Sequence, residues 1–255
     1  MIVLLNSSKT MKVDSQPGWT RHTQPEFLGD ARRLVEHLRT FSPDDLAGLM
    51  SISAKLAHQT AGQYAAWAAP STIKNARQAI LAFRGDVYAD LQPQSYTEDV
   101  LAFAQDHLRI LSGLYGILRP LDLIQAYRLE MAYKLKFAEA GNLYAFWRDK
   151  ITGSLLRLIA KQHASVLVNL ASAEYLRAVN LKELHLPVIT PVFKEKKGGQ
   201  YKFITVYAKR ARGAMCDFII RNRIGHIQDI KAFNQNGYTY KHSLSSEEKW
   251  VFGRG

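Results

Sequence analysis

Positive charge is concentrated between Phe193 and Lys231, where the chain has ten basic residues and three acidic ones. Apolar and aromatic residues such as Phe203, Ile204 and Tyr207 are interspersed with these charges, so we expect a folded segment and not a solvated basic tail. A folded surface of dense positive charge is typical of proteins that contact phosphates. Nucleic acid is therefore the first partner to consider.

Lys209, Arg210 and Arg212 stand at the start of a helix predicted for residues 208–223. Cations at this position oppose the helix dipole, which favours acidic residues in the first turn. We therefore expect these side chains to contact phosphates rather than to stabilise the helix. Lys194, directly after a strand predicted for residues 188–193, is expected to join them.

Two glycines, Gly113 and Gly116, lie between predicted helical segments in the stretch 107–120. Glycines in such a turn let the backbone approach a phosphate and leave amide hydrogens free to bind it. This spacing indicates a helix-hairpin-helix-like element that contacts nucleic-acid backbone. Three arginines stand around it: Arg109, Arg119 and Arg128. The alternative is an ordinary helix end followed by a packing glycine.

The polar loop Asn6–Thr10 follows a strand predicted for residues 2–5, and it contains Lys9. Ligands usually bind at the carboxyl ends of strands in open sheets. The loop lacks the glycines of a P-loop, which disfavours a nucleoside triphosphate as the ligand. The alternative is a solvated loop with no ligand.

Other chemistries have weaker support. The eight histidines and the one cysteine show no metal-ligand spacing, and no nucleophile motif is present, so we predict neither a metal nor another cofactor. Three acids stand in apolar or basic surroundings: Asp86, Glu130 and Glu174. They are candidates for general acid–base catalysis or metal binding, or else for ion pairs with Arg84, Arg128 and Arg177.

The predicted elements make one α+β (mixed α/β) domain over residues 1–255, with helices around a small mixed sheet that is assembled from strands distant in sequence. Strands are expected at 2–5, 165–170, 188–193, 201–207, 238–241 and 249–252. Helices are expected at 42–58, 73–83, 97–112, from 172, and at 208–223.

The composition gives 34 Lys and Arg against 22 Asp and Glu, a net charge of +12. No apolar run is long enough to cross a membrane, and the start of the chain is unlike a signal peptide. A single cysteine suits a reducing compartment. These features predict a cytoplasmic protein with no membrane partner, and we favour a monomer.

Five stretches of the sequence are characteristic: NARQAILAFRGDVY (75–88), HLRILSGLYGILRPLDLIQAYRLEM (107–131), LYAFW (143–147), VLVNLASAEY (166–175) and PVFKEKKGGQYKFITVYAKRARGAM (191–215). On these stretches the chain resembles the YaaA peroxide stress protein family, also described as a domain of unknown function. The resemblance covers nearly the whole chain. The loop that usually reads Ser-Pro-Ala-Lys-Thr in the family is Asn6-Ser7-Ser8-Lys9-Thr10 here, without the proline.

The resemblance implies a cytoplasmic protein made under hydrogen peroxide stress, which limits damage to DNA and protein by lowering unincorporated iron. It also implies a single-domain α/β fold with a positively charged cleft, a helix-hairpin-helix-like element, and DNA binding with a preference for structured DNA over plain duplex.

We therefore expect a cleft that binds DNA mainly through phosphates. Its candidate residues are Lys9, Arg84, Arg109, Gly113, Gly116, Arg119, Arg128, Lys194, Lys209, Arg210 and Arg212. A second hypothesis is an enzyme that acts on a small anionic or nucleotide-like substrate, with Lys9, Asn169 and Glu174 as catalytic candidates. A third is direct iron sequestration. A deep pocket around Lys9 with a perturbed acid favours the enzyme, whereas an open basic groove favours DNA.

Overall fold

The central strands of the protein are apolar at almost every position, which is typical of strands covered on both faces. β1 (Ile2–Asn6) reads IVLLN, and its first four side chains are fully buried. The computed structural model describes residues 1–13 and 19–255. It has one central mixed sheet with helices around it, which confirms the predicted mixed α/β class. One connected cluster of buried apolar side chains, from Met1 to Phe252, forms the core.

The central sheet has the strand order β11-β12-β9-β8-β1-β5-β6, and β10 pairs with β9. Besides β1, its strands are β5 (Leu108–Ser112), β6 (Gly116–Leu118), β8 (Leu167–Asn169), β9 (Val188–Lys197), β10 (Gln200–Lys202), β11 (Thr239–Tyr240) and β12 (Lys249–Arg254). β12, β9, β8, β1 and β5 are parallel, whereas β6, β10 and β11 pair antiparallel. Two-residue strands form two further pairs: β2 (Thr10–Met11) with β4 (Phe83–Arg84), and β3 (Arg77–Gln78) with β7 (Leu123–Ile124).

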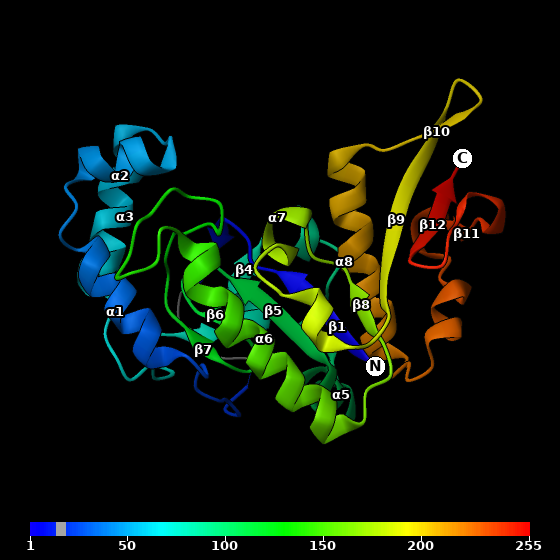
Figure 1. Cartoon of the computed structure of the whole chain (residues 1–255), viewed down its shortest axis with the longest axis horizontal. Helices are drawn as coiled ribbons and strands as arrows, with labels where there is room; N and C mark the ends of the chain where they lie inside the picture. Colours follow the sequence, from blue (N-terminus) through cyan, green and yellow to red (C-terminus); the bar gives the residue numbers. More distant parts are fainter. Residues whose placement is uncertain (14–18) are drawn as a thin grey trace.

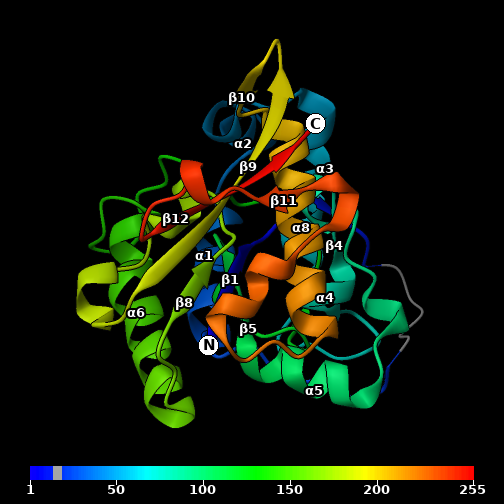
Figure 2. The ribbon, with the colours of Figure 1, turned by 90° about the vertical axis from the view of Figure 1, so that its right-hand side faces the viewer.

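Helices cover both faces of this sheet. The α-helices are α1 (Leu28–Leu38), α2 (Pro43–Met50), α3 (Ala54–Ala66), α4 (Ala79–Ala82), α5 (Glu98–His107), α6 (Leu143–Gln162), α7 (Ala173–Leu176) and α8 (Thr205–Arg221). The 3-10 helices are η1 (Asp86–Tyr88), η2 (Pro93–Ser95), η3 (Leu181–Leu184), η4 (Ile227–Ala232), η5 (Gln235–Gly237) and η6 (His242–Leu244). The sheet lies between α6 on one side and α5 and α8 on the other (Figure 2). Among the described residues, no helix has both the length and the apolar content that a membrane crossing requires.

The direction in which the chain crosses the sheet reverses beside β1. After β1 the chain forms β5, which lies on one side of β1. It later forms β8 on the other side of β1 and then β9, which lies beyond β8. The loops that leave β1 and β8 at their carboxyl ends therefore run in opposite directions. Such a point in a parallel sheet leaves a crevice between the loops, where ligands usually bind.

Several predicted boundaries are wrong. The helix expected at 42–58 is two helices, because Ser51 adopts a left-handed conformation (φ 51°) between α2 and α3. The start of this helix is as expected, since Ser42 is the N-cap of α2 and forms a reciprocal capping box with Asp45. The helix expected at 73–83 is reduced to α4 between two short strands, which are held by pairing with β7 and β2.

The helix expected at 97–112 is also wrong in its second half. α5 ends at His107, and β5 continues beside β1 with Leu108 opposite Val3. The helix-hairpin-helix-like element is therefore a β-hairpin, in which Ser112 of β5 pairs with Gly116 of β6. Leucine and isoleucine suit both helix and strand, so the pairing with β1 decides the outcome. The strand expected at 201–207 ends at Lys202, because α8 begins at Thr205.

Candidate functional site

A pocket of about 430 Å³ lies at the crevice between the loops that follow β1 and β8. Its lining residues come from five parts of the chain: residues 6–10 at the end of β1 and beyond it, residues 85–87, Ser172, Glu174 and Tyr175 after β8, the α8 side chains of Lys209 and Arg212, and Glu130. The loops that form it therefore leave the carboxyl ends of parallel strands, as expected for a ligand site in such a sheet.

Lys9 forms an ion pair with Glu130 in this pocket. Its Nζ lies 2.6 Å from Oε2 of Glu130, and the lysine side chain is about half exposed (52%). The hydrogen bond to Glu130 raises the pKa of Lys9. Lys9 therefore stays protonated and acts as a fixed cation, not as an amine nucleophile.

Glu174 also lines the pocket and is partly buried. Burial raises the pKa of its carboxyl, and the nearby charge of Glu130 raises it further. The backbone N–H of Ala132 donates to its Oε1 at 3.2 Å, and Lys9 and Lys209 also favour the ionised form, but these effects are smaller. A carboxyl held in this way keeps its proton at higher pH than usual, which suits a general acid.

The cations from α8 reach the pocket because a glycine lets the helix approach closely. A Cβ atom at Gly213 would lie 1.9 Å from the carbonyl oxygen of Val87, so only glycine allows α8 to pack on η1 at this distance. Lys209 is exposed and Arg212 half-buried. Among residues 1–13 and 19–255, neither side chain forms an ion pair or a side-chain hydrogen bond. Burial lowers the pKa of Arg212, because the charged guanidinium loses contact with water.

Hydrogen bonds fix the two loops after β1 and β8 that line the pocket. The backbone N–H of Ser172 donates to Oδ1 of Asn6 at 2.9 Å, and the Tyr88 hydroxyl donates to the Asn6 carbonyl at 2.9 Å. The Ser7 hydroxyl donates to the hydroxyl of Tyr175 at 3.1 Å. The pocket is therefore held in shape before any ligand arrives.

Two other predicted residues lie beside the pocket. Arg128 lines an adjoining cavity of about 210 Å³, which shares Lys9 and Thr10 with the pocket and extends toward α3. Arg84 lies on β4, opposite Thr10, and its guanidinium donates to the carbonyls of Leu81 and Phe83.

The remaining predicted residues lie elsewhere. Gly116 packs against the Trp147 ring, and a Cβ at Gly113 would lie 2.3 Å from the Leu129 carbonyl oxygen, so both glycines serve packing. Four predicted basic residues line neither cavity: Arg109, Arg119, Lys194 on β9 and Arg210. Arg109 donates to the Gln105 and Leu108 carbonyls, and burial lowers its pKa to about 10. Arg119 forms an ion pair with Asp122 at 2.8 Å, and Arg210 forms one with Asp90 at 2.9 Å.

The three acids singled out in the sequence are Asp86, Glu130 and Glu174, and all three line the pocket. No pattern in the sequence predicted that they would lie together. The ion pair of Glu130 is with Lys9, not with the arginine expected for it. Asn169, a catalytic candidate, is buried outside the pocket, where its amide donates to Thr190 and its oxygen accepts from the Ala171 N–H. Ser7 and Tyr175 were missed, although their positions just after β1 and β8 were a usable signal.

Metal ligands are not grouped in the described part of the chain. No set of three or more His, Cys, Asp or Glu side chains is arranged there to hold a metal ion.

The sheet and the pocket define a mixed α/β protein with a charged pocket at the ends of parallel strands. A family model described as "Peroxide stress protein YaaA" matches residues 1–244. The chain belongs to this family, as its motifs predicted.

Relatives match it from end to end. The UPF0246 protein azo1887 of Azoarcus sp. (strain BH72) is 48% identical over an alignment of 258 positions, which covers 100% of this chain and 99% of the relative. A UPF0246 protein of Hahella chejuensis (strain KCTC 2396) is 46% identical over 100% of this chain and 99% of the relative. A third, UPF0246 protein MADE_1015435 of Alteromonas mediterranea, is 48% identical over 100% of this chain and 98% of its own length.

Proposed function

We propose that this protein binds the phosphate backbone of DNA, in the cytoplasm and as a monomer, as part of the response to hydrogen peroxide. The observation that carries the proposal is the convergence of Lys9, Lys209 and Arg212 on one pocket at the strand ends. Membership of the peroxide stress family supports the physiological setting.

The charge balance of the pocket favours an anion despite its three carboxylates. Lys9 and Glu130 neutralise each other across 2.6 Å. The raised pKa of Glu174 lowers the cost of its neutral form when a phosphate approaches. Lys209 and Arg212 then face a single further acid, Asp86. A phosphate oxygen is a suitable partner for a half-buried guanidinium that has no carboxylate.

Salt dependence of DNA binding tests the proposal. The double variant Lys209→Ala, Arg212→Ala removes two cations of the pocket, and Arg210→Ala removes a neighbouring cation that is paired with Asp90 instead. Because each phosphate contact contributes about 0.9 to the slope of log affinity against log salt, we expect the double variant to flatten the slope by about 2. Arg210→Ala should change it much less. An unchanged slope in the double variant would remove the pocket from the DNA interface.

The same pocket supports a second candidate, an enzyme that acts on a small anionic or nucleotide-like substrate, and a pocket at Lys9 with a perturbed acid is the feature expected above for an enzyme. Two observations favour it: a volume of about 430 Å³, within the usual range for small-molecule sites, and a carboxyl of raised pKa beside a fixed cation. In this candidate Glu174 is the general acid, and Lys9 binds the substrate anion.

Ligand screening separates the two candidates. For an enzyme, inorganic phosphate or a nucleoside monophosphate should raise the melting temperature, and Glu174→Gln should abolish turnover while keeping that shift. For a DNA-binding protein, mononucleotides at millimolar concentration should leave the melting temperature unchanged, and an oligonucleotide should raise it.

We further propose that the protein lowers unincorporated iron without storing it. The described residues offer no cluster of ligands for iron, so the effect would follow from DNA protection or from the chemistry of the pocket. Iron(II) titration of the metal-free protein should show only weak binding. A tight site of one iron per chain would instead establish direct sequestration.

A further inference from the structure

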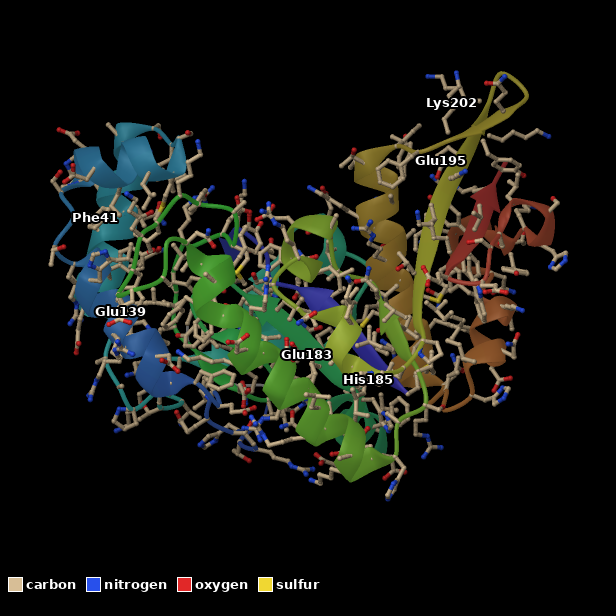
Figure 3. The ribbon with its side chains drawn as sticks, in the orientation of Figure 1. Phe41, Glu139, Glu183, His185, Glu195 and Lys202 are labelled. Carbon is tan, nitrogen blue, oxygen red and sulfur yellow. The ribbon has the colours of Figure 1, made fainter. Side chains whose placement is uncertain are left out.

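A second cavity, of about 650 Å³, lies at the end of the sheet opposite the pocket at Lys9. It forms where three neighbouring parallel strands begin, and residues just before β8, β9 and β12 line it together with residues of η4 and β11. Figure 1 shows β11 and β12 at the right-hand side of the protein. In Figure 3, His185 lies near the beginning of β9 and Glu195 near its far end. No described residue lines both sites, so the two are separate.

The lining of this cavity is mainly apolar. Val166 and Ile189 are buried in it, and Ile227 of η4 is partly buried. The rings of Tyr240 and Trp250 complete the apolar lining, with their centroids 6.0 Å apart. A concave and mainly apolar cavity of this size, with a few polar groups, is the usual form of a small-molecule site.

One cation, Lys231, is held against these two rings. Its Nζ lies 4.4 Å from the centroid of the Trp250 ring and 5.0 Å from that of the Tyr240 ring. Attraction between an ammonium and aromatic faces fixes the side chain without neutralising its charge. Lys231 forms no ion pair with any residue that the structure describes, so the N–H groups of its ammonium are available to an anion.

Trp250 provides a second donor. Its side chain is only 6% exposed, and its indole N–H donates to no group within the described parts of the chain. Buried tryptophan N–H groups usually have a hydrogen-bond partner. The Ser245 hydroxyl, which also lines the cavity, is already engaged, since it donates to the Lys241 carbonyl and accepts from the Val251 N–H. A ligand that accepts hydrogen bonds would satisfy the indole N–H instead.

We propose that this cavity binds a small carboxylic acid with an aromatic or branched apolar body. The carboxylate pairs with Lys231 and accepts from the indole N–H of Trp250, while the apolar body packs on Val166, Ile189 and Ile227. Hydrogen bonds to a carboxylate are about twice as strong as those between neutral groups. This binding goes beyond the proposed DNA binding and does not depend on it.

The charges of the cavity disfavour other ligands. A cation would meet the ammonium of Lys231, which already lies over both aromatic rings. Nucleic acid or a phosphate dianion would find Lys231 as the one lysine or arginine among the described lining residues. Glu247, which is exposed and also lines the cavity, disfavours a second negative charge on the ligand. One negative charge on an apolar body therefore fits best.

Saturation-transfer NMR with 4-phenylbutyrate tests this binding, and the neutral 4-phenylbutyramide and the cationic 4-phenylbutylamine are comparison ligands with the same apolar body. We expect the acid to bind with a Kd of about 1 mM, as is usual for a ligand of this size. The amide and the amine should bind about tenfold more weakly, because neither makes the charged hydrogen bond. Lys231→Met keeps the apolar stem, so it should weaken the acid about tenfold and leave the amide unchanged. Trp250→Phe keeps a ring and should weaken the acid more than the amide.

Lys241→Met is the matched control, because the Lys241 ammonium also lies over a ring, that of Tyr201 at 5.9 Å, but outside the cavity. It should bind the acid as the native protein does. Ser165→Phe places bulk in the cavity from an exposed position, so it should abolish binding of the acid even if Lys231→Met does not fold. Equal affinity of the native protein for acid and amide, or no binding of the acid, would overturn the proposal. Unchanged affinity for the acid in Lys231→Met or in Ser165→Phe would overturn it as well.

Discussion

Gly213→Ala tests whether the close packing of α8 on η1 builds the pocket. The added Cβ would lie 1.9 Å from the Val87 carbonyl oxygen, which is 1.5 Å closer than the 3.4 Å at which ordinary contact begins. The obstacle is backbone, so a change of rotamer cannot relieve it, and α8 or η1 must move. Overpacking of this kind costs typically about 1–3 kcal/mol, and we place this variant at the upper end.

The helix itself gains from the change, because alanine is about 1 kcal/mol more favourable than glycine within a helix. The expected net loss in the free energy of unfolding is therefore about 2 kcal/mol, or about 4–8 °C in melting temperature for a chain of this length. Movement of α8 also displaces Lys209 and Arg212 from the pocket. DNA binding should then weaken even at temperatures where the variant is folded.

Urea unfolding followed by circular dichroism measures the loss, with Gly62→Ala as the control. Gly62 lies within α3, is exposed, and has nothing within 4 Å of an added Cβ. Gly62→Ala should raise the free energy of unfolding by up to about 1 kcal/mol. If Gly213→Ala is as stable as the native protein, or is stabilised like the control, the contact between α8 and η1 is not as tight as described.

Three further predictions concern single side chains. Glu174→Gln should match the native protein in melting temperature at pH 4 and exceed it at pH 7–8. The pKa of the Glu174 carboxyl in the folded protein is raised above the ordinary 4.5, so ionisation of this partly buried group destabilises the native fold as the pH rises through that pKa. Parallel curves of melting temperature against pH would contradict this. Cys216 is fully buried, and burial raises the pKa of its thiol, so a disulfide reagent should modify it only after unfolding; rapid reaction of the native protein would refute that expectation. Ser51→Gly should raise the free energy of unfolding by about 1 kcal/mol in a urea titration, since glycine adopts the left-handed conformation (φ 51°) without the cost that serine bears.

The sequence predicted the end of a helix or strand correctly where neighbouring residues determine that end, and wrongly where pairing with a distant strand determines it. α2 begins directly after its N-cap Ser42, close to the expected start at residue 42, because the reciprocal cap between Ser42 and Asp45 involves four consecutive residues. Leu108–Ser112 was assigned to a helix, because its apolar residues fit helical spacing as well as a strand. Pairing with Val3 and Asn6, about a hundred residues earlier in the chain, decides between the two, and spacing along the chain cannot reveal it.

The candidate site divides in the same way. Lys9, Lys209 and Arg212 were predicted from their charge and from their positions at a strand end and a helix start, and all three line the pocket. Arg109 and Arg119 have the same charge, but the structure places them in contacts with backbone and with Asp122. Residue type alone could not separate these arginines, since the difference depends on which groups surround them after folding.

By itself, the sequence determined the family, the mixed α/β class and the concentration of positive charge near α8, because motifs, strand composition and net charge are properties of the chain alone. Only the tertiary structure decided that Glu130 pairs with Lys9, that Asp86 and Glu174 share their pocket, and that Gly113 and Gly116 belong to a β-hairpin. These outcomes depend on the order of parallel strands in the sheet and on the approach of α8 to η1. Both bring together residues that are far apart in the chain, and their contacts are fixed only when the whole core packs.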